Sequence, residues 1–269
     1  MTGSATPNND SIVKVEHHDQ VTVLEMNSPP HNLVGPALMA GILDGAKLAS
    51  DCGSRCILLK SGLRNFSAGA DLTLFERPAK GQDSQARENG PTAAEFLMDM
   101  ENIPIPVVTS IHGVCLGGGL EIALTTDYII AARSARIGSV EATLGLHPIM
   151  GGVQRQVERV GLIRAKEMSM LARRYDPATL ERWNLINLVV DDEQLEATAM
   201  SIAQELGNGP TIAHSATKSL ARVAADEGIS VADKKMIEIQ KPIWRSADLK
   251  TGLASFMKRG PGLARFEGK

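Results

Sequence analysis

Neither sign of charge dominates this sequence. Lysine and arginine total 28, aspartate and glutamate total 31, and the net charge is -3. Proteins that bind nucleic acid or an anionic membrane usually carry a clear excess of basic residues. The composition therefore predicts no nucleic-acid partner and no membrane partner, and any basic site must be local.

Cysteine is scarce and apolar runs are short. The three cysteines, Cys52, Cys56 and Cys115, form no CxxC pair and no regular framework, which indicates a reducing compartment. No apolar run approaches the roughly 18 residues that span a bilayer. The first ten residues are polar and resemble neither a signal peptide nor a transit peptide, so we read them as a loose terminus. We expect a soluble, cytoplasmic protein.

Histidine offers no metal-binding pattern. The six histidines are scattered, and no set of histidine and carboxylate residues has the spacing of metal ligands. The sequence therefore predicts no metal site and no redox cofactor.

Strand and helix patterns alternate up to about residue 195. Apolar and polar residues alternate over 12–16 and 21–26, which predicts a hairpin, and Pro36 suits the first turn of a helix over 35–49. This order predicts an α/β architecture with right-handed crossovers. We expect residues 77–91, which are polar, to form a mobile surface loop. The further expected elements are strands over 56–59, 105–111, 128–132 and 136–138, and helices over 92–102 and from the glycines at 117–119.

From residue 196 onward the pattern is only helical. Apolar residues recur on one helix face in the segment 195–206, and three further helices are expected near 210–226, 228–241 and 247–258. We therefore divide the chain into an α/β core, residues 1–195, and a helical region, residues 196–269.

Two glycine-containing loops each lead from a strand into a helix. Their sequences are FSAGAD over 66–71 and LGGGLE over 116–121. Glycine at a helix start lets a ligand approach the unpaired first-turn N–H groups, so two facing loops would form a two-donor oxyanion hole. A single glycine triplet more often marks a tight turn or close packing. The dinucleotide pattern GxGxxG is absent.

Three segments, taken together, are similar to the enoyl-CoA hydratase/isomerase, or crotonase, family. They are FSAGAD over 66–71, IPVVTSIHGVCLGGGLEIAL over 105–124 and EATLGLHPIMGGVQR over 141–155. The resemblance implies a crotonase-like spiral of ββα units with a C-terminal helical region. It also implies assembly as a homotrimer or homohexamer, with the helical region serving oligomerisation.

The resemblance further implies the catalytic groups. The N–H groups of Ala70 and Gly118 would hold the thioester oxygen. Glu121 would activate water and Glu141 would protonate C2, so that water adds across the double bond of a 2-enoyl-CoA. Both glutamates could instead be structural, Glu121 as an ordinary acid at a helix N-terminus, and Glu141 as a cap or an ion-pair partner of Arg136 or Arg155.

The resemblance also implies how acyl-CoA, the expected partner, is bound. Coenzyme A is part of the substrate, so no separate cofactor is expected. Ile149 stands where hydratases commonly carry glycine and would add bulk near the acyl pocket. We interpret His112 and His147 as structural. The expected substrate-binding residues are His31, Arg64, Ala68, Asp71, Gly117, Ile149, Lys258 and Arg259, where each basic side chain could instead be a solvated surface charge.

Other functions remain open on this scaffold. An enoyl-CoA isomerase needs one principal base and can dispense with Glu141. A thioester or carbon–carbon bond hydrolase has only His147 and Ile149 in its favour. A catalytically silent acyl-CoA binder would be expected to have lost a carboxylate or a glycine loop, and this sequence keeps both. The sequence does not specify the acyl group.

Overall fold

The computed structural model describes residues 11–81 and 91–269. The expected loose terminus over residues 1–10, and residues 82–90 of the expected loop over 77–91, lie outside the described residues. Within the described start of that loop, Glu76–Ala79 forms a short helix, α2, so a loop beginning at residue 77 was wrong there.

A six-stranded mixed sheet organises the core, in the order β1-β2-β3-β4-β6-β8. The expected hairpin is confirmed: β1 and β2 pair antiparallel, and every later neighbour pairs parallel. A second, two-stranded sheet consists of β5 and β7. The strands are β1 (Val13–His18), β2 (Val21–Met26), β3 (Cys56–Ser61), β4 (Val107–Ile111), β5 (Val114–Leu116), β6 (Tyr128–Ala132), β7 (Arg136–Gly138) and β8 (Leu188–Val190).

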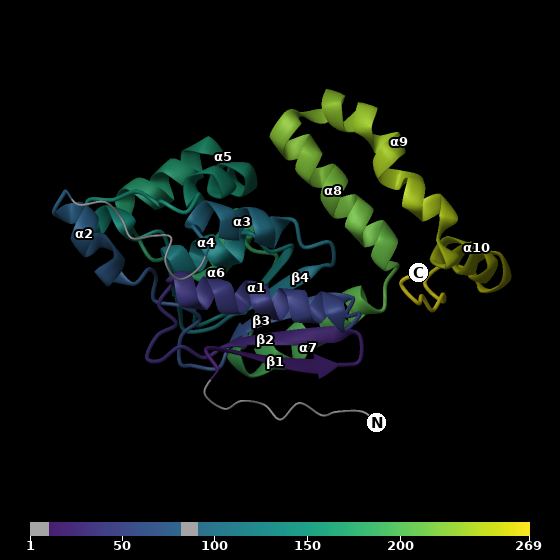
Figure 1. Ribbon diagram of the computed structural model, residues 1–269, viewed down its shortest axis with the longest axis horizontal. Helices are drawn as coiled ribbons and strands as arrows, with labels where there is room; N and C mark the ends of the chain where they lie inside the picture. Colours follow the sequence, from purple (N-terminus) through teal and green to yellow (C-terminus); the bar gives the residue numbers. More distant parts are fainter. Residues whose placement is uncertain (1–10, 82–90) are drawn as a thin grey trace.

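Helices cover both faces of the large sheet (Figure 1). One apolar cluster joins β2 residues such as Leu24 to Ile42 of α1, Phe96 of α3 and Leu120 of α4. A second cluster on the other face packs α7 against the strands. The helices of the core are α1 (Pro36–Asp51), η1 (Leu72–Phe75), α3 (Ala93–Glu101), α4 (Gly118–Leu124), η2 (Glu141–Leu144), α5 (Gly152–Leu171), α6 (Pro177–Arg182), η3 (Asp192–Gln194) and α7 (Leu195–Gly207).

The last three helices form an arm that projects from the core (Figure 1). They are α8 (Thr211–Glu227), α9 (Ile229–Arg245) and α10 (Ala247–Arg259). Lys218 on α8 joins the arm to the core, since its Nζ donates to Asp127 Oδ2 at 2.6 Å and to the Ile105 carbonyl at 2.9 Å. The projecting part begins at α8, because α7 packs on the sheet; the division at 195/196 stays a prediction.

No helix within residues 11–81 and 91–269 is long and apolar enough to cross a membrane.

Candidate active site

The two glycine-containing loops lie against each other. The Ser67 N–H donates to the Val114 carbonyl at 3.1 Å, and the Leu116 N–H donates to the Ser67 carbonyl at 3.1 Å. A Cβ added at Gly119 would lie 2.5 Å from Ser67 Cβ, a distance that real side chains do not reach. Gly119 is therefore needed because the first turn of α4 packs directly on the 66–71 loop.

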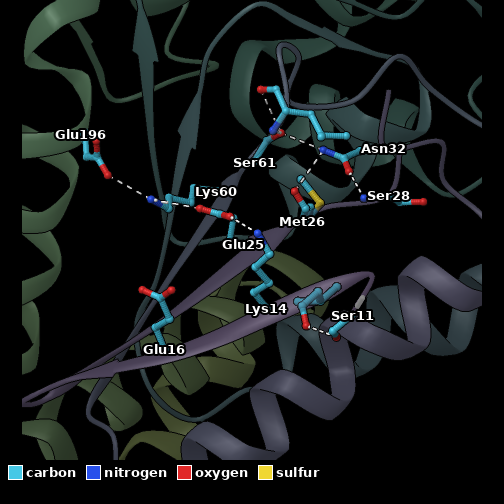
Figure 2. A network of polar contacts seen from close by, with 12 residues as sticks. Ser11, Lys14, Glu16, Glu25, Met26, Ser28, Asn32, Lys60, Ser61 and Glu196 are labelled. Carbon is cyan, nitrogen blue, oxygen red and sulfur yellow. Dashed lines mark hydrogen bonds and ion pairs between the residues drawn. The ribbon is translucent and has the colours of Figure 1, made fainter. Parts of the chain in front are cut away.

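Asn32 links the 66–71 loop to the end of β2 and to β3. Its contacts with Ser28, Met26 and Ser61 are drawn in Figure 2. Its side chain is fully buried and sits just after the paired prolines of the 29–32 segment. Asn32 Nδ2 donates to Ser61 Oγ at 2.8 Å and to the Phe66 carbonyl at 3.1 Å, and its Oδ1 accepts from the Ser28 N–H at 2.8 Å. Only His31 of this segment was named from the sequence, as an expected substrate contact, and the support that Asn32 gives to the loop was not predicted.

One N–H group from each loop is left without a protein acceptor. Val34 accepts from the Asp71 N–H at 2.9 Å and donates to the Gly69 carbonyl at 2.8 Å, so the Ala70 N–H between them points the other way. Gly118 is the first residue of α4, where N–H groups have no intrahelical partner. Within the described chain, neither N–H donates to a protein acceptor. Two free donors on touching loops can stabilise a developing oxyanion.

Gly117 shapes this helix start. Its φ of 49° and ψ of −123° lie in a region that residues with a Cβ avoid. A Cβ added there would also lie 3.1 Å from Glu141 Oε1. Gly117 therefore gives α4 its entry angle and leaves room for the Glu141 carboxyl group.

Glu121 lies in the first turn of α4 and is only 2% exposed. Its Oε1 accepts two backbone hydrogen bonds, from Met150 N–H at 2.9 Å and Gly152 N–H at 2.7 Å. Burial, with a further contribution from the negative charge of Glu141, raises the pKa of Glu121 to about 7 despite these two bonds. An ordinary solvated acid at a helix N-terminus does not fit this burial.

Glu141 begins the 3₁₀ helix η2, three residues after the end of β7. Both of its carboxyl oxygens are buried, and neither has a hydrogen-bond partner among the described residues. Burial raises the pKa of Glu141, while His147 acts in the opposite direction. The alternative ion pairs do not form: the Arg136 guanidinium donates to the carbonyls of Ser134 and Ala135, and the Arg155 guanidinium pairs with Glu101.

Two buried carboxyl groups and two free N–H groups therefore share one region. Glu121 is close enough to Glu141 for their charges to interact, and Gly117 and Gly118 open the helix that carries Glu121. Such a set can polarise a carbonyl and exchange protons at the adjacent carbons.

Four of the residues expected to contact coenzyme A lie in or beside the 66–71 loop: His31, Arg64, Ala68 and Asp71. The His31 carbonyl accepts from the Ala68 N–H at 3.0 Å, and His31 Nδ1 lies 3.2 Å from Asn65 Nδ2. The Arg64 side chain is exposed, and the Asp71 carboxylate caps η1.

The remaining expected contacts are more dispersed. Ile149 is 49% exposed and precedes Met150, whose N–H holds Glu121. Lys258 and Arg259 are at the end of α10, in the projecting arm and apart from α4 (Figure 1). The structure does not bring these two cations to the glycine loops of their own chain.

Neither histidine near the loops has a nucleophile as its partner. His112 Nε2 lies 2.6 Å from the Leu63 carbonyl, and His147 Nδ1 lies 2.8 Å from the Pro148 carbonyl. Cys115 is fully buried, and burial raises the pKa of its thiol. In the part of the chain that the structure describes, no group of three or more histidine, cysteine or carboxylate side chains could hold a metal ion.

Comparison with known proteins decides the family. The profile of "Enoyl-CoA hydratase/isomerase" proteins matches residues 16–268. The chain belongs to this family. Among its relatives are mouse "Enoyl-CoA hydratase domain-containing protein 2, mitochondrial" and Escherichia coli (strain K12) "1,2-epoxyphenylacetyl-CoA isomerase". The mouse protein is 32% identical in sequence, and the match covers 93% of this chain and 85% of the mouse protein. The bacterial isomerase is 31% identical, and the match covers 80% of this chain and 82% of the isomerase.

Solved structures agree with the expected fold. An enoyl-CoA hydratase from Bacillus anthracis superposes with a TM-score of 0.85 at 25% identity, covering 96% of this chain and all of that one. The crotonase fold, with its C-terminal helical region, is therefore confirmed. Relatives within this family are named for different reactions. Membership of the family therefore does not specify the reaction, which depends on the residues of the site.

Proposed function

We propose that this protein hydrates a 2-enoyl-CoA thioester to a 3-hydroxyacyl-CoA. The observation that carries the proposal is the pair of buried carboxyl groups with raised pKa values, Glu121 and Glu141, next to the free N–H groups of Ala70 and Gly118. A one-base reaction does not require the second buried carboxyl group.

The two carboxyl groups have different surroundings, which suggests different roles. Two backbone N–H groups fix Glu121 Oε1 and leave Oε2 to accept a proton from water. Water oxygen then bonds to C3 as the double bond shifts toward the thioester, and the Ala70 and Gly118 N–H groups stabilise the enolate oxygen. Glu141, with a raised pKa and no hydrogen-bond partner, gives its proton to C2. Proton return from Glu121 to Glu141 completes the cycle.

The other features of the substrate complex are also proposals. Adding water to a conjugated thioester consumes no oxidant or reductant, so the reaction needs no cofactor besides the coenzyme A of the substrate. We propose that His31, Arg64, Ala68 and Asp71 contact coenzyme A around the 66–71 loop, and that Gly117 and Ile149 contact the acyl part. Lys258 and Arg259 would then contribute from a neighbouring subunit of a homotrimer or homohexamer, because α10 extends from its own core.

The location in the cell stays a prediction. We propose the cytoplasm from the sparse, unpaired cysteines, whereas the name of the mouse relative includes the word mitochondrial.

Isomerisation of an enoyl-CoA is the second candidate, because the family is described as containing both enoyl-CoA hydratases and isomerases. An isomerase moves a proton between carbons and does not add water. The site would then use one carboxyl group as the principal base, and Glu141 would be dispensable.

A substrate panel with two matched variants tests the proposal. Loss of the conjugated enoyl-thioester absorbance is measured with crotonyl-CoA and longer 2-enoyl-CoAs, for the wild type, Glu121→Gln and Glu141→Gln. We expect the wild type to consume at least one substrate and each variant to lose at least about a hundredfold in kcat. Full activity of Glu141→Gln would contradict the two-carboxylate mechanism.

A further inference from the structure

Arg155 holds the peptide group that anchors Glu121. The guanidinium Nη1 donates to the Gly151 carbonyl at 3.1 Å. The same planar peptide group carries the Gly152 N–H, which donates to Glu121 Oε1 at 2.7 Å. Arg155 and Glu121 therefore bind opposite ends of one peptide dipole.

Glu101 determines where the Arg155 guanidinium points. Glu101 is the last residue of α3, and its two carboxylate oxygens take both Nε and Nη2 of Arg155, each at 2.7 Å. This is a two-point contact, which fixes the plane of the guanidinium. The side chains are 11% and 12% exposed, so water competes little for the pair. The remaining nitrogen, Nη1, is left facing Gly151.

The helical arm contacts the same carboxylate. Arg222 on α8 donates to Glu101 Oε1 at 3.0 Å and also pairs with Asp226 on its own helix. Its side chain is 37% exposed, so its contact is weaker than that of Arg155. The contacts thus run from α8 through Glu101 and Arg155 to the Gly151–Gly152 peptide group.

We propose that Arg155 is a positioning residue for Glu121, that Glu101 aims it, and that Arg222 links this arrangement to the arm. The three guanidinium nitrogens of Arg155 contact Glu101 and the Gly151 carbonyl, so Arg155 acts on Glu121 through the Gly151–Gly152 peptide group. The inference rests on the proposed catalytic role of Glu121. The charged groups that act on Glu121 are Arg155 from α5 and Glu141 from η2, and Arg155 is the one that lowers its pKa.

Titration of Glu121 in the free protein tests this inference independently of the reaction. Glutamate side chains are labelled with ¹³C at Cδ, and the Glu121 signal is assigned by its loss in Glu121→Gln. We expect its pKa to rise in Arg155→Met, to rise less in Arg155→Lys and Glu101→Gln, and least in Arg222→Gln. Arg164→Met is the matched control, because Arg164 is on the same helix and pairs with Glu167 and Trp183.

Kinetics give the second readout. If the hydratase proposal holds, Arg155→Lys should lose about tenfold in kcat with little change in KM, because a displaced carboxylate acts on the chemical step. If Arg155→Met does not fold, Arg155→Lys and Glu101→Gln carry the test. Folded Arg155 and Glu101 variants with the Glu121 titration of the wild type would overturn the inference. Absence of hydratase activity together with shifted titrations would overturn only the proposed function.

Discussion

At the residue scale, the environment of Glu121 decides what it can do. Buried carboxyl groups favour the protonated form, and Glu121 combines burial with the nearby negative charge of Glu141. A carboxyl group with a pKa of about 7 exchanges protons readily near neutral pH, which suits a general base.

The raised pKa of Glu121 also makes folding stability depend on pH. The folded-state pKa of Glu121, about 7, lies above its ordinary value of 4.5. The contribution of Glu121 to the free energy of unfolding is therefore fully present below pH 4.5 and is lost as the pH rises through 7. We expect the free energy of unfolding to fall by on the order of 2–3 kcal/mol across this window relative to Glu121→Gln, whose amide does not titrate. Urea unfolding of both proteins at several pH values measures this. Parallel curves for the two proteins would contradict the assignment.

Gly117 should matter for activity beyond its backbone strain. We expect Gly117→Ala to cost about 1–2 kcal/mol of stability through its positive φ and to lose most activity, because the new Cβ meets Glu141 Oε1. Gly53→Ala is the matched control: its φ is 74°, and an added Cβ meets nothing within 4 Å. Thermal unfolding and kcat are compared for both. Equal activity in the two variants would show that the space beside Glu141 is not needed.

The two glutamates could be predicted from the sequence, but the groups that hold them could not. Glu121 and Glu141 were predicted from matched segments, since their residue types and order are visible in the sequence. The N–H groups of Met150 and Gly152 carry no side-chain signature, and Glu101 lies 54 residues from its partner Arg155. Backbone donors and long-range ion pairs of this kind require the folded chain.

At the element scale, pattern strength explains which strands and helices were predicted. The first two strands alternate clearly, and α1 starts at Pro36, so both were found. Strands β5 and β8 have three residues each, which is too short to show the alternation of apolar and polar residues, and neither was predicted. The long helix α5 contains Gly161 with φ of 76°, a kink that interrupts its helical pattern, and it was not predicted either.

The segment after β2 acts as a support for the 66–71 loop, and Asn32 tests that role. Asn32→Asp keeps the shape of the side chain but replaces the amide nitrogen, which donates to the Phe66 carbonyl, with a carboxylate oxygen, which can only accept. We expect a loss of about 2–3 kcal/mol of stability and a lower kcat. Asn208→Asp, an exposed asparagine that donates to the Gln204 carbonyl, is the matched control. Unchanged unfolding of Asn32→Asp would show that the hydrogen bonds of Asn32 do not hold the loop.

At the scale of the whole molecule, the arm leaves large apolar side chains uncovered. Trp244 on α9 and Phe256 and Met257 on α10 are exposed, Met257 to 85%. Patches of this kind mark interaction surfaces, which agrees with the proposed homo-oligomer.

Sedimentation measures this association. We expect a mass of several times 28.7 kDa for the wild type, and dissociation when Phe256→Asp and Met257→Asp are combined. Lys250→Asp places a negative charge on the same helix at an exposed polar position and should leave the mass unchanged. A wild type that sediments at 28.7 kDa would contradict the proposed assembly.

The most direct test of the account follows the oxygen of water. The wild type is incubated with a 2-enoyl-CoA that it consumes, in H₂¹⁸O, and the products are analysed by mass spectrometry. We predict one ¹⁸O in the 3-hydroxyl group of an intact acyl-CoA, and a much slower appearance of that product with Glu141→Gln. An acyl-CoA with a shifted double bond and no ¹⁸O, or label in a released carboxylate, would contradict hydration and assign the site to isomerisation or hydrolysis.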